Sequence, residues 1–128
     1  MRIKSQYVKP EFKKKYNPKV GLLALTTDLT IEKDFNSVFS QLPIDVFVNR
    51  IHNENPLTKE NLLKMCDQIK GITEKILPGE KINTVAYGCT SGTIAIGEDK
   101  VKERIQLAKP DCYVTTPVTS AIKAFKLM

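Results

Sequence analysis

The chain has 128 residues, of which 41% are hydrophobic and 27% charged, and its formal net charge is +6 at pH 7. This length and composition are typical of one globular domain that buries roughly two-thirds of the surface of its unfolded chain. No apolar run approaches the ~20 residues of a membrane helix, and the start of the chain lacks the features of a secretory signal. We therefore expect a cytoplasmic protein with no membrane partner.

The positive charge is spread along the chain. Lys13, Lys14 and Lys15 form the only block of lysines, and later lysines alternate with acidic residues as on a solvated helix face. No stripe of aromatic residues interleaves with the basic ones, which argues against nucleic acid as a partner. Attraction of an anionic substrate explains the charge equally well.

The three cysteines, Cys66, Cys89 and Cys112, are far apart and lack CxxC spacing. This pattern favours neither a disulfide framework nor a metal site, and we expect no cofactor from it.

The chain begins with a polar arm, residues 1–18, and the predicted α/β domain covers residues 19–128. Residues 19–25 are apolar at successive positions, as in a central parallel strand that is covered on both faces. Residues 26–30, TTDLT, form the first loop. Thr30 is the expected cap of a helix whose apolar positions have helical spacing: Phe35, Val38, Phe39 and Leu42.

Residues 44–49 form a second predicted strand, rich in β-branched and aromatic residues. The loop that follows contains His52, which is either a substrate contact or, as we favour, an exposed loop histidine. Thr58 can cap a long helix with a buried stripe. The stripe comprises Leu62, Leu63, Met65, Cys66, Ile69, Ile72 and Ile76.

Residues 82–87 read as a short buried third strand, followed by Gly88, Cys89 and four small residues, TSGT. The glycines allow a sharp turn, and backbone N–H groups at a helix start can hold an anion or favour a thiolate. Cys89 is thus a candidate base or nucleophile. The alternative is that Cys89 is a small buried hydrophobe beside an ordinary turn.

The remaining chain predicts a turn of helix at 93–96, a helix ending before Pro110, a short strand at 112–115 and a last helix that begins near Thr116. Four alternations of strand and helix predict parallel units with right-handed crossovers. The expected fold is α/β, with a four-stranded parallel flavodoxin-like half-sheet of order 2-1-3-4 flanked by helices. The loops after strands one, three and four should meet at one edge.

Four segments carry a resemblance to a known family: VGLLALTTDLTIEKDF, NPLTKENLLKM, ILPGEKINTVAYGCTSGTIAIGED and TTPVTSAIKAF. Together they resemble the aspartate/glutamate racemase superfamily, in the branch of maleate isomerase, arylmalonate decarboxylase and the ectoine-utilisation protein A group. The resemblance implies cofactor-independent isomerase or racemase chemistry on a small carboxylate or amino-acid substrate. It also implies two similar α/β halves, with one cysteine from each half facing the substrate.

Within this resemblance, Cys89 matches the cysteine of the first half, which serves as nucleophile or as acid and base. Thr90 and Ser91 match positions that hold a substrate carboxylate through backbone and hydroxyl donors. These donors would also stabilise the enolate-like charge of such reactions, while the thiolate carries out the covalent or proton-transfer step.

The other implied substrate contacts lie in two further loops. Thr26 and Thr27 can donate hydrogen bonds, and Thr116 lies at the matching edge after the fourth strand. Asp28 departs from the family, because maleate isomerases usually have asparagine there. An anionic side chain repels a carboxylate unless it is protonated or otherwise engaged.

The resemblance covers only the first half of such an enzyme. The second cysteine belongs to the other half, and neither Cys66 nor Cys112 is a convincing substitute for it. We therefore expect a truncated chain that is inactive alone, with the apolar face of its last helix partly uncovered. Two classes remain: an isomerase or racemase completed by a second half or a homo-oligomer, and a non-catalytic half-domain that binds an anion or a partner chain.

Overall fold

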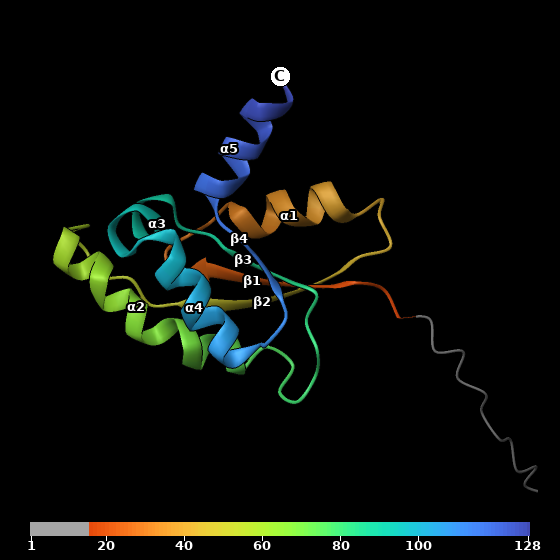
Figure 1. The fold of residues 1–128 in the computed structure, drawn as a ribbon, viewed down its shortest axis with the longest axis horizontal. Helices are drawn as coiled ribbons and strands as arrows, with labels where there is room; N and C mark the ends of the chain where they lie inside the picture. Colours follow the sequence, from red (N-terminus) through yellow and green to blue (C-terminus); the bar gives the residue numbers. More distant parts are fainter. Residues whose placement is uncertain (1–15) are drawn as a thin grey trace, which may run out of the picture.

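Four parallel strands form the centre of the computed structural model, which describes residues 16–128. The strand order is β2-β1-β3-β4 (Figure 1), so the α/β fold and the order 2-1-3-4 are confirmed. All but the last three residues of the predicted N-terminal arm lie outside the described part. The strands are β1 (Lys19–Leu25), β2 (Asp45–Ile51), β3 (Thr84–Tyr87) and β4 (Tyr113–Thr115).

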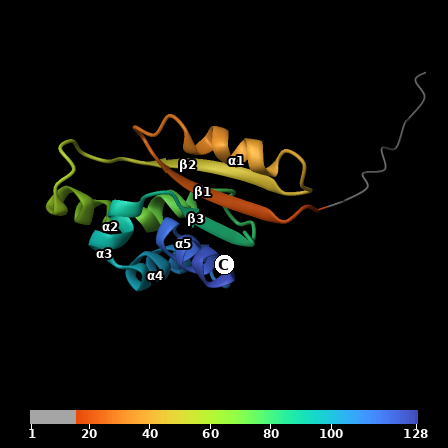
Figure 2. The same ribbon diagram turned by 90° about the horizontal axis from the view of Figure 1, so that it is seen from above.

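Five helices flank the sheet. Two of them, α1 (Ile31–Phe39) and α5 (Pro117–Leu127), lie on one side of it (Figures 1 and 2). The opposite face is covered by α2 (Lys59–Glu74), α3 (Thr90–Ile96) and α4 (Glu98–Ala108). This arrangement follows from right-handed crossovers between parallel strands.

The two faces differ in how much apolar surface they bury. Leu23 and Val85 point towards α2 and α4, where they pack in a large core with Ile69 and Ile105. The α1 face holds a smaller cluster of Leu22, Ala24 and Ala86 with half-buried side chains of α1 and β2. Side chains alternate between the faces along each strand, so β1 contributes to both cores.

The sequence patterns predicted where the helices lie, but fewer of the apolar helix side chains are buried than the patterns suggested. Val38 and Leu42 belong to the apolar positions predicted for this helix, yet both are exposed, because α1 packs on the sheet through Ile31 and Phe35. Leu63 of α2 is also exposed, because it lies at the rim of the stripe. The helix after β3 begins at Thr90, three residues before the predicted turn.

The last helix is largely uncovered, as the sequence predicted. Helix α5 extends away from the sheet (Figure 1), and every residue from 121 to 128 is exposed. Phe125 and Leu127 are 75% and 90% exposed. A contiguous apolar surface of this kind usually marks a site of interaction.

We predict that Phe125→Ala and Leu127→Ala each reduce the fluorescence of a dye that binds apolar surface. The unfolding free energy should change by less than about 0.5 kcal/mol, because both side chains are already exposed. Leu23→Ala is the matched control: its side chain is fully buried, and its loss should cost about 2–5 kcal/mol. Absence of dye binding by the unmodified chain would contradict an uncovered α5.

Candidate functional site at the carboxyl edge of the sheet

The strands end in register at one edge of the sheet. Leu25 pairs with Ile51 across β1 and β2, and Leu23 pairs with Tyr87 across β1 and β3. Ala86 pairs with Thr115 across β3 and β4. Adjacent strands lie about 4.8 Å apart, so the loops after β1, β3 and β4 meet at the carboxyl edge as predicted. The loop after β2 joins them there.

Gly88 shapes the junction between β3 and α3. A Cβ atom at this position would lie 2.6 Å from Ile31 Cδ1 and 3.0 Å from the carbonyl oxygen of Leu23. Such distances leave no room for a side chain, while the Gly88 N–H donates to that same carbonyl at 2.8 Å. The close approach fixes where the chain leaves the sheet and therefore where Cys89 lies.

Cys89 is the N-cap residue of α3. Its Sγ accepts a hydrogen bond from the backbone N–H of Gly92 at 3.2 Å and lies 3.6 Å from Ser91 Oγ. The side chain is only 5% exposed and packs at the margin of the larger core. The sulfur thus lies at the predicted strand end beside N–H and O–H donors, under cover of the first turn of α3.

Thr90 and Ser91 occupy the first turn of α3, and both are exposed. Ser91 joins the surroundings of the thiol to an open cavity of about 460 Å³ between α2 and α3. Lys59, at the start of α2, lines the same cavity. Sequence reasoning treated Lys59 only as part of a helix start; its position directly after the cap Thr58, near the sheet edge, was the available signal.

The hydroxyl groups of Thr26 and Thr27 both contact Asn53. They donate to its Oδ1 at 3.1 and 3.2 Å, and Asn53 Nδ2 lies 3.0 Å from Thr27 Oγ1. Asn53 is buried and is the second residue after β2, which extends two residues beyond its predicted end. Sequence reasoning missed Asn53, and a correct end for β2 would have placed it level with Thr27.

Asp28 caps α1, a role that the sequence had assigned to Thr30. Its Oδ1 accepts from the N–H groups of Thr30 and Ile31 at 2.8 and 2.9 Å, and the Thr30 side chain makes no cap bond. The backbone N–H of Ile31, followed by that of Thr30, holds the pKa of Asp28 below its ordinary value. Asp28 is therefore a carboxylate engaged by backbone N–H groups.

Arg50 holds the same loop from β2. Its guanidinium group donates to the carbonyl oxygens of Leu25 and Asp28 at 2.7 and 2.8 Å and pairs with Glu32 on α1. A planar donor fork suits this task, because it satisfies several acceptors at once. Arg50 was not recognised from the sequence.

Thr116 lies at the carboxyl edge but is bonded away from the other loops. It is buried and caps α5, accepting from the Thr119 N–H at 3.1 Å. Its hydroxyl also donates to Glu98 Oε1 at the start of α4, at 3.3 Å. The structure therefore divides these residues among three groups. Thr26 and Thr27 contact Asn53, Cys89 lies beside Ser91, and Thr116 contacts Glu98.

The other singled-out residues have structural surroundings. His52 is exposed, as favoured, and its backbone is held by the Gln68 side chain. Cys66 lies half-buried on α2, and burial raises the pKa of Cys112. Between residues 16 and 128, no three His, Cys, Asp or Glu side chains are grouped to hold a metal ion. In the same range no helix has the length and apolarity to cross a bilayer.

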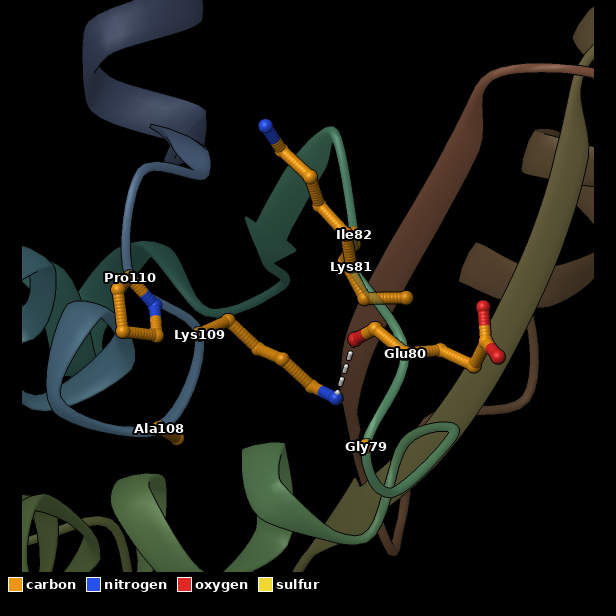
Figure 3. Close-up of a pocket in the computed structure, with 7 residues that line it drawn as sticks. All are labelled: Gly79, Glu80, Lys81, Ile82, Ala108, Lys109 and Pro110. Carbon is orange, nitrogen blue, oxygen red and sulfur yellow. Dashed lines mark hydrogen bonds between the residues drawn. The ribbon is translucent and has the colours of Figure 1, made fainter.

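A second cavity, of about 330 Å³, lies at the opposite edge of the sheet. Figure 3 shows Lys109 reaching across it, and its ammonium group donates to the carbonyl oxygens of Leu77 and Glu80 at 2.8 and 3.0 Å. These bonds hold the turn before β3. Backbone carbonyl groups therefore satisfy the hydrogen-bond donors of this buried lysine, and its role at the cavity is structural.

Comparison with known proteins identifies a likeness in fold. The structure is similar to the crystal structure of the maleate isomerase Iso from Pseudomonas putida S16, with a TM-score of 0.69 and 14% sequence identity. The similarity covers 87% of this chain and 49% of that one, so the chain spans about half the length of the isomerase. No family model and no curated protein sequence matches the chain. The fold is therefore similar to that of about half of a maleate isomerase.

We predict that Asp28→Ala destabilises the protein by about 1 kcal/mol at neutral pH through loss of the helix cap. The folded-state pKa of Asp28 is lowered, so its stabilisation is present above the ordinary value of 3.8 and is lost as the pH falls through the lower folded value. In denaturant unfolding at a series of pH values, the unfolding free energies of the wild-type chain and of Asp28→Ala should converge as the pH falls. A constant gap across the acid range would rule out this role.

We predict that Gly92→Ala destabilises the protein by about 1–3 kcal/mol through overpacking. The added Cβ would lie 2.6 Å from Tyr87 Oη and 3.0 Å from Cys89 Sγ. Gly71→Ala on α2 is the matched control, because no atom lies within 4 Å of its Cβ and alanine favours the helix. Thermal unfolding that ranks the two variants equally would show that the space around Cys89 is not tight.

Proposed function

We propose that this chain forms one lobe of a cofactor-independent isomerase or racemase that acts on a small carboxylate or amino acid. The observation that supports the proposal is the position of Cys89. Its sulfur lies at the carboxyl end of β3, accepts the Gly92 N–H, and does so in a fold like that of a maleate isomerase. The sequence motifs around Cys89, which resemble the aspartate/glutamate racemase superfamily, add to this support.

In the proposed reaction, the Cys89 thiolate either removes the proton next to the substrate carboxylate or adds to an alkene carbon. Addition forms a C–S bond and moves the alkene electrons onto the carboxylate as an enolate. Rotation about the resulting single bond and loss of the thiolate then restore the alkene with the other geometry. Substrate and product have the same formula, so the cycle consumes no further reactant.

The same proposal gives the neighbouring residues a role in holding an anion. The backbone and hydroxyl donors of Thr90 and Ser91 are exposed beside the sulfur, and Lys59 adds positive charge to the cavity that Ser91 lines. Thr26 and Thr27 would turn their hydroxyls from Asn53 towards the substrate. Fixed donors of this kind stabilise an enolate-like charge as it develops.

Asp28 and Thr116 have a different part in the proposal. Asp28 is bonded to the backbone of α1 and would position the Thr26–Thr27 loop, while Thr116 would fix the start of α5. A second acid facing the substrate would come from a second lobe, either in the same protein or in a partner copy. The uncovered apolar face of α5 is available for contact with that lobe.

A second candidate function is a non-catalytic half-domain that binds an anion or a partner chain. Two observations favour it: Cys89 is only 5% exposed, and α5 presents Phe125 and Leu127 to solvent. In this case the thiol would serve as the cap of α3 and as part of the core. The two candidates predict different reactivities for Cys89.

We predict that iodoacetamide at neutral pH alkylates Cys89 faster than free cysteine and faster than Cys112, whose pKa burial raises. Donors around Cys89 Sγ favour the thiolate, which is the nucleophilic form. Peptide mapping by mass spectrometry measures each site, with Cys89→Ser as the control. Reaction of Cys89 at or below the rate of free cysteine would favour the non-catalytic half-domain.

A further inference from the structure

Tyr87 has a buried hydroxyl group with no hydrogen-bond partner in the described part of the protein. The residue is 1% exposed and ends β3, two positions before Cys89. An unsatisfied buried hydroxyl costs roughly 1–3 kcal/mol, so its presence needs an explanation. Phenylalanine would fill the same space without that cost.

The hydroxyl group is directed at the surroundings of the thiol. Tyr87 Oη lies 2.6 Å, and Cys89 Sγ 3.0 Å, from the point where a Cβ atom of Gly92 would stand. Both atoms therefore border the same small space above Gly92, and no hydrogen bond joins them in this structure. Sγ already accepts from the Gly92 N–H and lies near Ser91 Oγ.

We propose that Tyr87 is a positioning residue for Cys89, whose hydroxyl group donates a hydrogen bond to the sulfur once the thiol has lost its proton. This inference rests on the proposed function of Cys89. The thiolate would then have three donors: the Gly92 N–H, the Ser91 hydroxyl and the Tyr87 hydroxyl. A hydrogen bond to the charged form favours that form, and such bonds are the stronger ones.

The hydroxyl group keeps its proton for this task. Burial raises the pKa of Tyr87, and the nearby Cys89 and Cys66 thiols raise it further. Tyrosine therefore remains a donor over the whole range in which a thiol titrates. No proton is transferred from Tyr87 in the proposal; the proton of Cys89 leaves to solvent or substrate.

The other ionisable groups on this side of the sheet edge come from α2, α4 and the β1–α1 loop. Helix α2 contributes Cys66 and, across the cavity, Lys59, while α3 contributes no ionisable side chain. On α4, Glu98 bonds a threonine and Arg104 pairs with an aspartate of α2. Asp28 in the β1–α1 loop is bonded to backbone N–H groups. These groups are unchanged by a substitution at Tyr87, so its effect on Cys89 can be measured separately.

The test is the pH dependence of Cys89 alkylation by iodoacetamide in the wild-type chain and in Tyr87→Phe. Loss of the hydroxyl should move the midpoint of the profile up by about one pH unit and slow alkylation near neutral pH by about tenfold. Tyr16→Phe, which removes an exposed hydroxyl before β1, should leave the profile unchanged. Thermal unfolding of Tyr87→Phe should occur at the same temperature or higher, because an unsatisfied polar group is lost.

Each outcome separates this inference from the proposed function. If Cys89 is alkylated preferentially but Tyr87→Phe leaves the profile unmoved, the positioning role is wrong and the proposed function stands. If Cys89 is not preferentially alkylated in the wild-type chain, the proposed function fails first. A Tyr87→Phe variant that unfolds at lower temperature would show that the hydroxyl has a structural partner, which also overturns the inference.

Discussion

The close passage of the chain at Gly88 is the constraint on which the site depends. The backbone leaves β3 against the carbonyl of Leu23, in a space that excludes any side chain. Cys89 must therefore follow as the cap of α3, with its sulfur bonded to the Gly92 N–H. Gly92 is constrained in a similar way, because a Cβ atom there would lie 2.6 Å from Tyr87 Oη and 3.0 Å from Cys89 Sγ. The position of the thiol is thus a result of backbone packing.

The two faces of the sheet differ in how much apolar surface they bury, which explains why an ordered sheet edge and an uncovered helix occur in one small domain. The α2 and α4 face carries the larger core, which holds β3 and the start of α3 rigidly. The α1 face buries less, and α5 extends beyond it with an exposed apolar surface (Figure 1). An uncovered apolar helix thus lies beside an ordered sheet edge, in a fold that is similar to about half of a maleate isomerase.

The sequence was sufficient for the fold because its signals were local. Alternating apolar runs and helical stripes placed the four strands and their order, and small residues after Tyr87 placed the thiol at the sheet edge. The partners of the site were not predictable in this way. Asn53 and Arg50 reach the first loop from β2, through contacts between residues distant in sequence.

Burial was the property least accessible from pattern alone. Helical spacing cannot say whether a neighbour covers an apolar face. Leu63 was predicted to lie in a buried stripe and is exposed, and Val38, at an apolar position of its helix, is exposed too. The cap of α1 was also predicted incorrectly from residue type. Thr30 is a typical capping residue, but it is Asp28 that accepts hydrogen bonds from the N–H groups of Thr30 and Ile31. That the Tyr87 hydroxyl lacks a hydrogen-bond partner could be learned only from the packing around Gly92.

The proposed function depends on a reactive Cys89, and its most direct test compares alkylation of the folded and the unfolded chain. The measurement is the rate at which iodoacetamide alkylates Cys89 at neutral pH, under native conditions and again in denaturant, with Cys112 as the internal control. The proposal predicts that Cys89 reacts faster in the native protein than in the unfolded chain, whereas Cys112, whose pKa burial raises, reacts more slowly in the native protein. Alkylation of Cys89 in the native protein at the same rate as in denaturant, or more slowly, would contradict the proposed function.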